Sequence, residues 1–109
     1  MANLRIERDG PVLRITMARP DRRNAFDAAL ISELAEAFVG VGRARAVVLA
    51  GDGQSFSAGA DVDWMRSSAD LSLEENVADA NALRRMLEAI DNCPAPVVAR
   101  VQGQALGGG

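Results

Sequence analysis

The first seventeen residues contain two short apolar runs with polar positions between them. The apolar residues of these runs are Leu4, Ile6, Val12, Ile15 and Met17. Asp9-Gly10 separates the two runs, and this dipeptide is typical of hairpin turns because glycine readily adopts a positive φ. The pattern therefore predicts a β-hairpin over residues 3–17.

Apolar positions three and four residues apart come next in the chain. They are Leu30, Ile31, Leu34, Phe38 and Val41. This spacing predicts a helix with one buried face. The carboxylate of Asp27 can cap the amino-terminal end of this helix, and Gly40 can end it. Residues 46–50 are a short, continuous apolar run. Such a run predicts a strand buried on both faces of a sheet.

A second helix and strand repeat this order. Ser72 and Glu75 fit a capping box, and one helical face then carries Val77, Ala80, Leu83, Leu87 and Ile90. Two prolines end this helix, and residues 97–101 form the next predicted strand. The alternation predicts a single α/β unit over residues 1–109. Because three glycines directly after a buried strand are an unusual end for a domain, we expect this unit to be part of a larger, truncated domain.

Composition and charge exclude several classes of function. The chain has no His and one Cys, so it cannot by itself build a His-based triad, a Cys-His dyad or a zinc site of the usual ligands. A net charge of −3, one Trp and no Tyr argue against a nucleic-acid partner. No apolar stretch approaches the roughly 20 residues of a membrane span, and no basic leader precedes an apolar run. We expect a cytoplasmic protein with no membrane partner.

Two loops of small residues follow the two central strands, at 55–61 and 103–109. Loops at the carboxyl ends of parallel strands are the usual ligand sites of α/β proteins, and residues without bulky side chains let a substrate approach backbone amides. Converging amides from two loops would stabilise an oxyanion. Tight packing turns are the alternative at this point. A dinucleotide or P-loop site is disfavoured, because neither glycine pattern is present.

Three segments resemble motifs of the crotonase (enoyl-CoA hydratase/isomerase) family. They are Arg19-Pro-Asp-Arg-Arg-Asn-Ala25, Phe56-Ser-Ala-Gly-Ala-Asp61 and the stretch from Pro96 to Gly109. The resemblance implies the amino-terminal part of a crotonase-like spiral of β-β-α repeats. It implies a coenzyme A thioester whose carbonyl oxygen accepts hydrogen bonds from the amides of Ala60 and Gly108, holding an enolate-like intermediate. Coenzyme A would be part of the substrate, with no separate cofactor, and the full chain would form homo-trimers or hexamers.

The resemblance also implies contacts with the rest of the substrate. The nucleotide end of coenzyme A would lie against backbone at Ala25, Ala58, Gly59, Asp61 and Val62. Arg22 and Arg23 would lie near its phosphates, although a solvated loop face explains these arginines equally well. Asp61 is better explained as the cap of a short helix over 62–65 than as an acid or base. Trp64 and Met65 would face the acyl chain or belong to the core. The glycines at 107–109 would open a helix directed at the thioester oxygen.

The family's usual catalytic glutamates would lie beyond Gly109, so the chain has the donors but no family-type base. Asp63 and Glu74 are nearby carboxylates that no motif supports as substitutes. We therefore expect a hydratase or lyase acting on an enoyl-CoA, inactive as this chain alone. Alternatives are an isomerase or hydrolase of the family, or a non-catalytic CoA-binding or assembly fragment. Residues 62–66 resemble methylglutaconyl-CoA hydratase-like members. In that subgroup Arg66 would be a candidate partner for a distal carboxylate of the acyl group, although a surface arginine explains it better.

Overall fold

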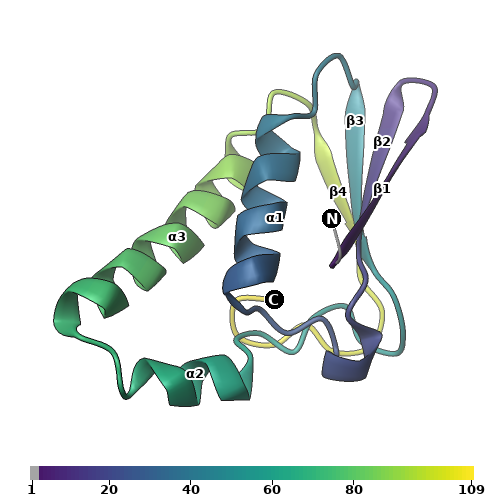
Figure 1. The fold of residues 1–109 in the computed structure, drawn as a ribbon. Helices are drawn as coiled ribbons and strands as arrows, with labels where there is room; N and C mark the ends of the chain where they lie inside the picture. Colours follow the sequence, from purple (N-terminus) through teal and green to yellow (C-terminus); the bar gives the residue numbers. More distant parts are fainter. Residues whose placement is uncertain (1–2) are drawn as a thin grey trace.

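A computed structural model describes residues 3–109, and it contains one four-stranded mixed sheet (Figure 1). The strands are β1 (Leu4–Asp9), β2 (Val12–Met17), β3 (Ala46–Gly51) and β4 (Val97–Arg100), in that spatial order. Strands β1 and β2 pair antiparallel, which confirms the predicted hairpin, and the β2–β3 and β3–β4 pairs are parallel. Parallel pairing brings the carboxyl ends of β2, β3 and β4 to one edge of the sheet.

Four helical segments connect or follow the strands: η1 (Pro20–Arg22), α1 (Ala28–Val39), α2 (Val62–Ser68) and α3 (Leu73–Asp91). Helices α1 and α3 lie side by side on one face of the sheet (Figure 1). Both predicted caps are confirmed. Asp27 Oδ1 accepts a hydrogen bond from Leu30 N at 2.9 Å, and Ser72 and Glu75 form a reciprocal capping box.

The hydrophobic core lies between the sheet and α1. Its centre consists of side chains that are fully buried: Ile15, Leu30, Leu34, Phe38, Val41 and Val47. The predicted burial of β3 on both faces is wrong, because Val47 and Leu49 face the core while Val48 and Ala50 are only half-buried. Helices α1 and α3 lie on the opposite face, and within residues 3–109 the face of Val48 is open and lines a hollow (Figure 1).

The apolar face predicted for α3 is confirmed only in part: Leu83 and Ile90 are partly buried and pack against the core. Met86 is the buried residue of α3, and Ala82 and Ala89 lie beside it against the core. Val77 and Leu87 are 50% and 42% exposed. The buried face is therefore centred on Met86 rather than on Leu87, and it shares Leu83 and Ile90 with the predicted face. Periodicity alone does not decide between two overlapping faces.

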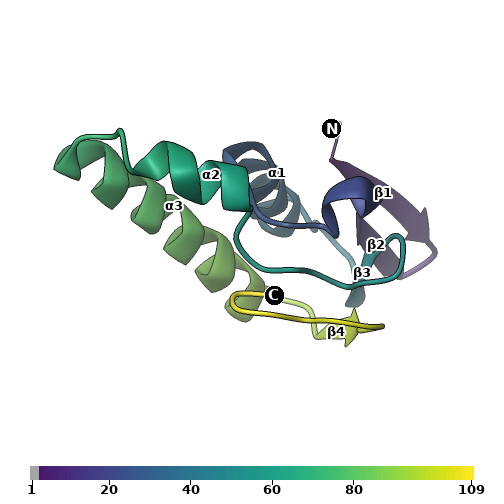
Figure 2. The ribbon, with the colours of Figure 1, turned by 90° about the horizontal axis from the view of Figure 1, so that it is seen from below.

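The loops after β3 and β4 run side by side across the carboxyl edge of the sheet (Figure 2). An isolated parallel bridge between Ser57 and Ala105 joins them. Gly107 and Gly108 form a turn at the end of the described residues, and a helix that opens at 107–109 stays a prediction. Gly107 has φ = +54°, a left-handed conformation that a right-handed helix cannot include. None of the helices within residues 3–109 has the length and apolar character of a membrane span.

Candidate functional site: two backbone loops at the sheet edge

A buried asparagine fixes the start of the first loop. Asn24 has no exposed surface, and its Nδ2 donates to the carbonyls of Asp52, Ser55 and Phe56 at 3.0, 3.0 and 3.2 Å. Its Oδ1 accepts from Arg19 N at 2.9 Å. Asn24 also has φ = +54°, which asparagine tolerates better than most residues. No pattern in the sequence indicates this role of Asn24, because a polar residue in a polar loop carries no local signal for it.

Ser57 shapes the middle of the same loop. Its fully buried hydroxyl donates to the Asn24 carbonyl at 3.1 Å and accepts from Gly59 N at 3.2 Å. Gly59 has φ = +84°, and a Cβ built on it would lie 2.7 Å from the Leu106 carbonyl oxygen. The first loop therefore contacts the second through a position that only glycine can occupy without displacing backbone.

The direction of the Ala60 amide follows from the bonds of its neighbours. The Gly59 carbonyl accepts from Phe26 N at 2.7 Å, and Asp61 N donates to the Phe26 carbonyl at 2.8 Å. The C=O and N–H of a trans peptide point in opposite directions, and the described chain has no cis peptide. The Ala60 N–H therefore points away from the Phe26 backbone. It donates to no group within residues 3–109.

The second predicted donor lies in a glycine turn. Gly109 N donates to the Leu106 carbonyl at 2.7 Å, which closes a β-turn with Gly107 and Gly108 at its centre. The Gly108 amide has no acceptor in the part of the chain that the structure describes. Leu106 N donates to the Ser57 carbonyl at 3.0 Å, which ties the turn to the first loop. Two unpaired amides thus lie in two loops that are in direct contact.

Asp61 caps α2, as the sequence predicted. Its buried carboxylate accepts from Trp64 N at 3.1 Å and lies 3.5 Å from Arg19 Nη2. Burial alone would raise the pKa of Asp61, but the Trp64 amide and the charges of Arg22 and Arg19 outweigh it and hold that pKa below its ordinary value. Asp61 is therefore a charged structural residue at neutral pH and is poorly suited to accept a proton.

The residues expected near coenzyme A surround this loop. Ala25 is buried and its carbonyl accepts from Arg19, while Ala58 N donates to the Arg23 carbonyl at 2.9 Å. Val62 is exposed at the start of α2. Arg22 forms ion pairs with Asp61 and Asp63. Arg23 is exposed and makes no ion pair with residues 3–109, which leaves it the freer of the two for a phosphate.

The side chains on α2 divide between the core and solvent. Trp64 is half-buried, packs against the core and lines a hollow between α1 and α3. Met65 is 51% exposed. Arg66 is exposed and lies 3.9 Å from Asp63 in a weak ion pair. Of the two residues expected at the acyl chain, Trp64 thus occupies the core position and Met65 is free to contact a ligand.

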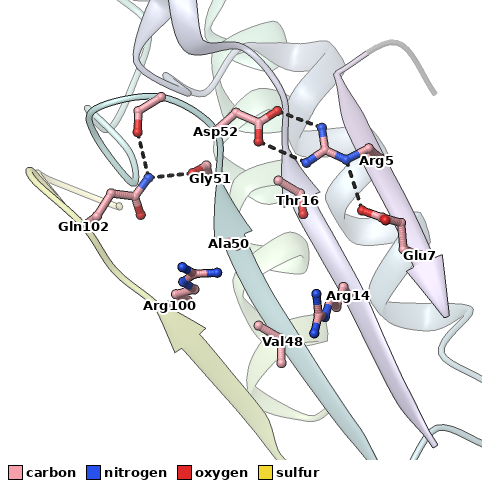
Figure 3. Close-up of a pocket in the computed structure, with 11 residues that line it drawn as sticks. Arg5, Glu7, Arg14, Thr16, Val48, Ala50, Gly51, Asp52, Arg100 and Gln102 are labelled. Carbon is pink, nitrogen blue, oxygen red and sulfur yellow. Dashed lines mark hydrogen bonds and ion pairs between the residues drawn. The ribbon is translucent and has the colours of Figure 1, made fainter. Parts of the chain in front are cut away.

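Another hollow lies over the open face of the sheet (Figure 3). Its charges are largely paired: Arg5 contacts both Asp52 and Glu7, and these contacts raise the pKa of Arg5 and lower that of Asp52. Gln102 lies at its rim and donates to the carbonyls of Gly51 and Gly53. None of the lining residues belongs to the predicted site. Within residues 3–109, no three carboxylate or cysteine side chains gather to hold a metal ion.

The chain is similar to known proteins of one family. The sequence model of the family described as "Enoyl-CoA hydratase/isomerase" matches residues 7–109. A probable enoyl-CoA hydratase of Mycobacterium tuberculosis is 40% identical over 90% of this chain and 38% of its own length. A human mitochondrial Delta(3,5)-Delta(2,4)-dienoyl-CoA isomerase is 34% identical over 90% of this chain and 33% of its own length. The chain therefore spans little more than a third of these curated relatives.

Solved structures match in three dimensions as well. A putative enoyl-CoA hydratase/isomerase (crotonase) from Legionella pneumophila superposes with a TM-score of 0.88 and 38% identity, covering 97% of this chain and 42% of that one. The fold is thus the amino-terminal portion of the crotonase fold. On the extent of the sequence match and this superposition, the chain belongs to the enoyl-CoA hydratase/isomerase family.

Proposed function

We propose that this chain supplies the oxyanion hole of an enzyme that hydrates an enoyl-CoA thioester. The observation that carries the proposal is the pair of free amides, at Ala60 and Gly108, in two loops held together by the Ser57–Ala105 bridge. Donors that are fixed before the substrate arrives stabilise negative charge without reorganisation. Losing one such donor costs about 3 kcal/mol of transition-state stabilisation.

In this proposal the thioester carbonyl lies between the two amides, and negative charge that develops on its oxygen is held as an enolate-like intermediate. The coenzyme A part of the substrate extends along the first loop, where Arg23 is free to meet a phosphate. Met65 on α2 is exposed and available to the acyl group. No cofactor beyond the substrate itself is required.

The carboxylates near the donors are not arranged as a catalytic base. Asp61 caps α2 and lies beside two arginines, and Asp63 is paired with Arg22. Glu74 is exposed in the first turn of α3. We infer that the 109-residue chain binds acyl-CoA without turning it over, and that hydration requires a carboxylate supplied by further residues. A cytoplasmic location and a trimeric or hexameric assembly stay predictions.

Calorimetric titration with acetyl-CoA and crotonyl-CoA tests the proposal when it is run beside a hydration assay at the enoyl absorbance. Binding of both thioesters without loss of absorbance is the expected result for this chain. Loss of absorbance would mean that a base is present after all. Absence of binding would refute the oxyanion site and a CoA-binding role together.

A second candidate is an isomerase of the same family. It is favoured by the match to the human dienoyl-CoA isomerase, which is nearly as similar to this chain as the hydratases. Both reactions pass through a stabilised thioester enolate, so the two amides serve either one. Incubation of a longer chain with a 3-enoyl-CoA separates them, because an isomerase moves the double bond while a hydratase alone does not.

A further inference from the structure

Phe26 contacts both proposed donor segments. Its backbone brackets Ala60: Phe26 N donates to the Gly59 carbonyl at 2.7 Å and its own carbonyl accepts from Asp61 N at 2.8 Å. These bonds fix the peptide that carries the Ala60 amide. In the sequence Phe26 stands between Ala25 and the helix cap Asp27, where no pattern indicates a function for it.

The ring of Phe26 reaches the other donor. The residue is 6% exposed, and a Cβ built on Gly108 would lie 3.4 Å from Phe26 Cε2 and 3.8 Å from Cδ2. The backbone at Gly108 therefore rests near the edge of the ring. Residues 107–109 have no side chains of their own with which to pack. Their position thus depends on what the backbone touches, namely the first loop and this ring.

We propose that Phe26 is a positioning residue that sets the spacing between the Ala60 and Gly108 amides. This inference rests on the proposed function, because the spacing matters only if both amides bind one oxygen. The main chain of Phe26 orients the Ala60 amide, and the ring of Phe26 supports the Gly108 segment. A smaller side chain leaves the main-chain bonds in place and removes only the support at Gly108. The distance between the Ala60 and Gly108 amides is then no longer fixed.

Phe26→Leu is the test, and Phe38→Leu is its matched control. Phe38 is also a buried phenylalanine, but it lies on α1, in the core away from both loops. Both variants are expected to unfold at lower urea concentration than the wild type. The discriminating readout is the stretching frequency of the thioester carbonyl in bound acetyl-CoA labelled with ¹³C at that carbon, measured by isotope-edited infrared spectroscopy. Hydrogen bonds to the oxygen lower this frequency.

We expect the wild type and F38L to lower the carbonyl frequency equally, and F26L to lose half or more of that shift. The affinity of F26L for acetyl-CoA should fall up to about tenfold, the worth of one hydrogen bond, while its affinity for free coenzyme A, which has no carbonyl at this position, stays unchanged. An F26L variant that keeps the full shift overturns the inference. So does an F38L variant that loses as much as F26L.

A measurement on the wild type covers the case in which F26L does not fold. Nuclear Overhauser contacts between the Phe26 ring protons and the Gly108 Hα protons are expected both in the free chain and with acetyl-CoA bound. Their absence overturns the inference even if acetyl-CoA binds with a lowered carbonyl frequency. A wild type that binds acetyl-CoA with no change in frequency refutes the proposed function itself, and the inference with it.

Discussion

Replacing Asn24 by Ala should destabilise the chain more than removing any single polar side chain of the first loop, residues 55–61. The amide of Asn24 reaches three carbonyls on the segment 52–56, and its oxygen accepts the Arg19 amide. The side chain is completely buried, so water cannot replace these bonds without entering the core. Alanine removes all of them at once.

The magnitude follows from the number of groups left unpaired. An amide NH₂ has two protons, so it satisfies about two of the three carbonyls fully. Two buried carbonyls without donors cost about 3 kcal/mol together, taking about 1.5 kcal/mol for each. Alanine at φ = +54° adds roughly 1 kcal/mol of backbone strain. The expected loss is about 4 kcal/mol, a large fraction of the roughly 5–15 kcal/mol that stabilises a typical domain.

Urea unfolding followed by the fluorescence of Trp64, the single tryptophan, measures this loss. Asn24→Gly is the companion variant, because glycine accepts the positive φ and should lose less than alanine. Asn92→Ala is the control: Asn92 is exposed and its side chain makes no hydrogen bond with residues 3–109, so it should change the free energy of unfolding by less than about 0.5 kcal/mol. A loss for N24A below about 1 kcal/mol would refute the reasoning.

Three further changes test other parts of the structure. Ser72→Ala should cost about 1 kcal/mol in the same unfolding assay by removing the capping box of α3. Gly59→Ala should weaken acetyl-CoA binding at least tenfold in calorimetry, because its Cβ would meet the Leu106 carbonyl at 2.7 Å, whereas Gly40→Ala, at an unstrained helix end, should leave binding unchanged. Asp61→Asn tests how the stability of the fold depends on pH in acid. Because the pKa of Asp61 is lowered by folding, its stabilising contribution is present above about pH 4, the ordinary aspartate pKa, and is lost as the pH falls through the lowered value. The free energy of unfolding of D61N should therefore fall less steeply with decreasing pH than that of the wild type. An equally steep fall, measured by urea unfolding at several pH values below 4, would contradict this.

The elements of the fold were predictable because their signals are local. The hairpin turn at Gly10, the cap at Asp27 and the capping box at Ser72 each involve residues within a few positions of one another. The errors arose where a local pattern had two solutions. On α3, the predicted and the buried faces overlap at Leu83 and Ile90, but Leu87 is exposed and Met86 is buried. On β3, a continuous apolar run suited burial on both faces, and Val48 is only half-buried.

The supports of the site were not predictable in the same way. Asn24 bonds with carbonyls 28 to 32 positions away, and Ser57 reaches back to Asn24 over 33 positions. No periodicity or cap marks such pairs, because the contact exists only after the sheet has brought the loops together. The resemblance to a family identified the loops as important, but only the structure shows which residues hold them.

A site made of backbone amides places its sequence requirements on neighbours of the donors rather than on the donors. Any residue other than proline could supply the amide of Ala60. The residues around it are constrained: Ser57 bonds with Gly59 N, Gly59 must lack a Cβ to meet Leu106, and Asp61 caps the helix that follows. The sequence of the segment from Phe56 to Asp61 is therefore constrained because its residues hold the peptide plane of the Ala60 amide in place. On the proposed function, changes to these supports should impair binding of the thioester more than binding of free coenzyme A.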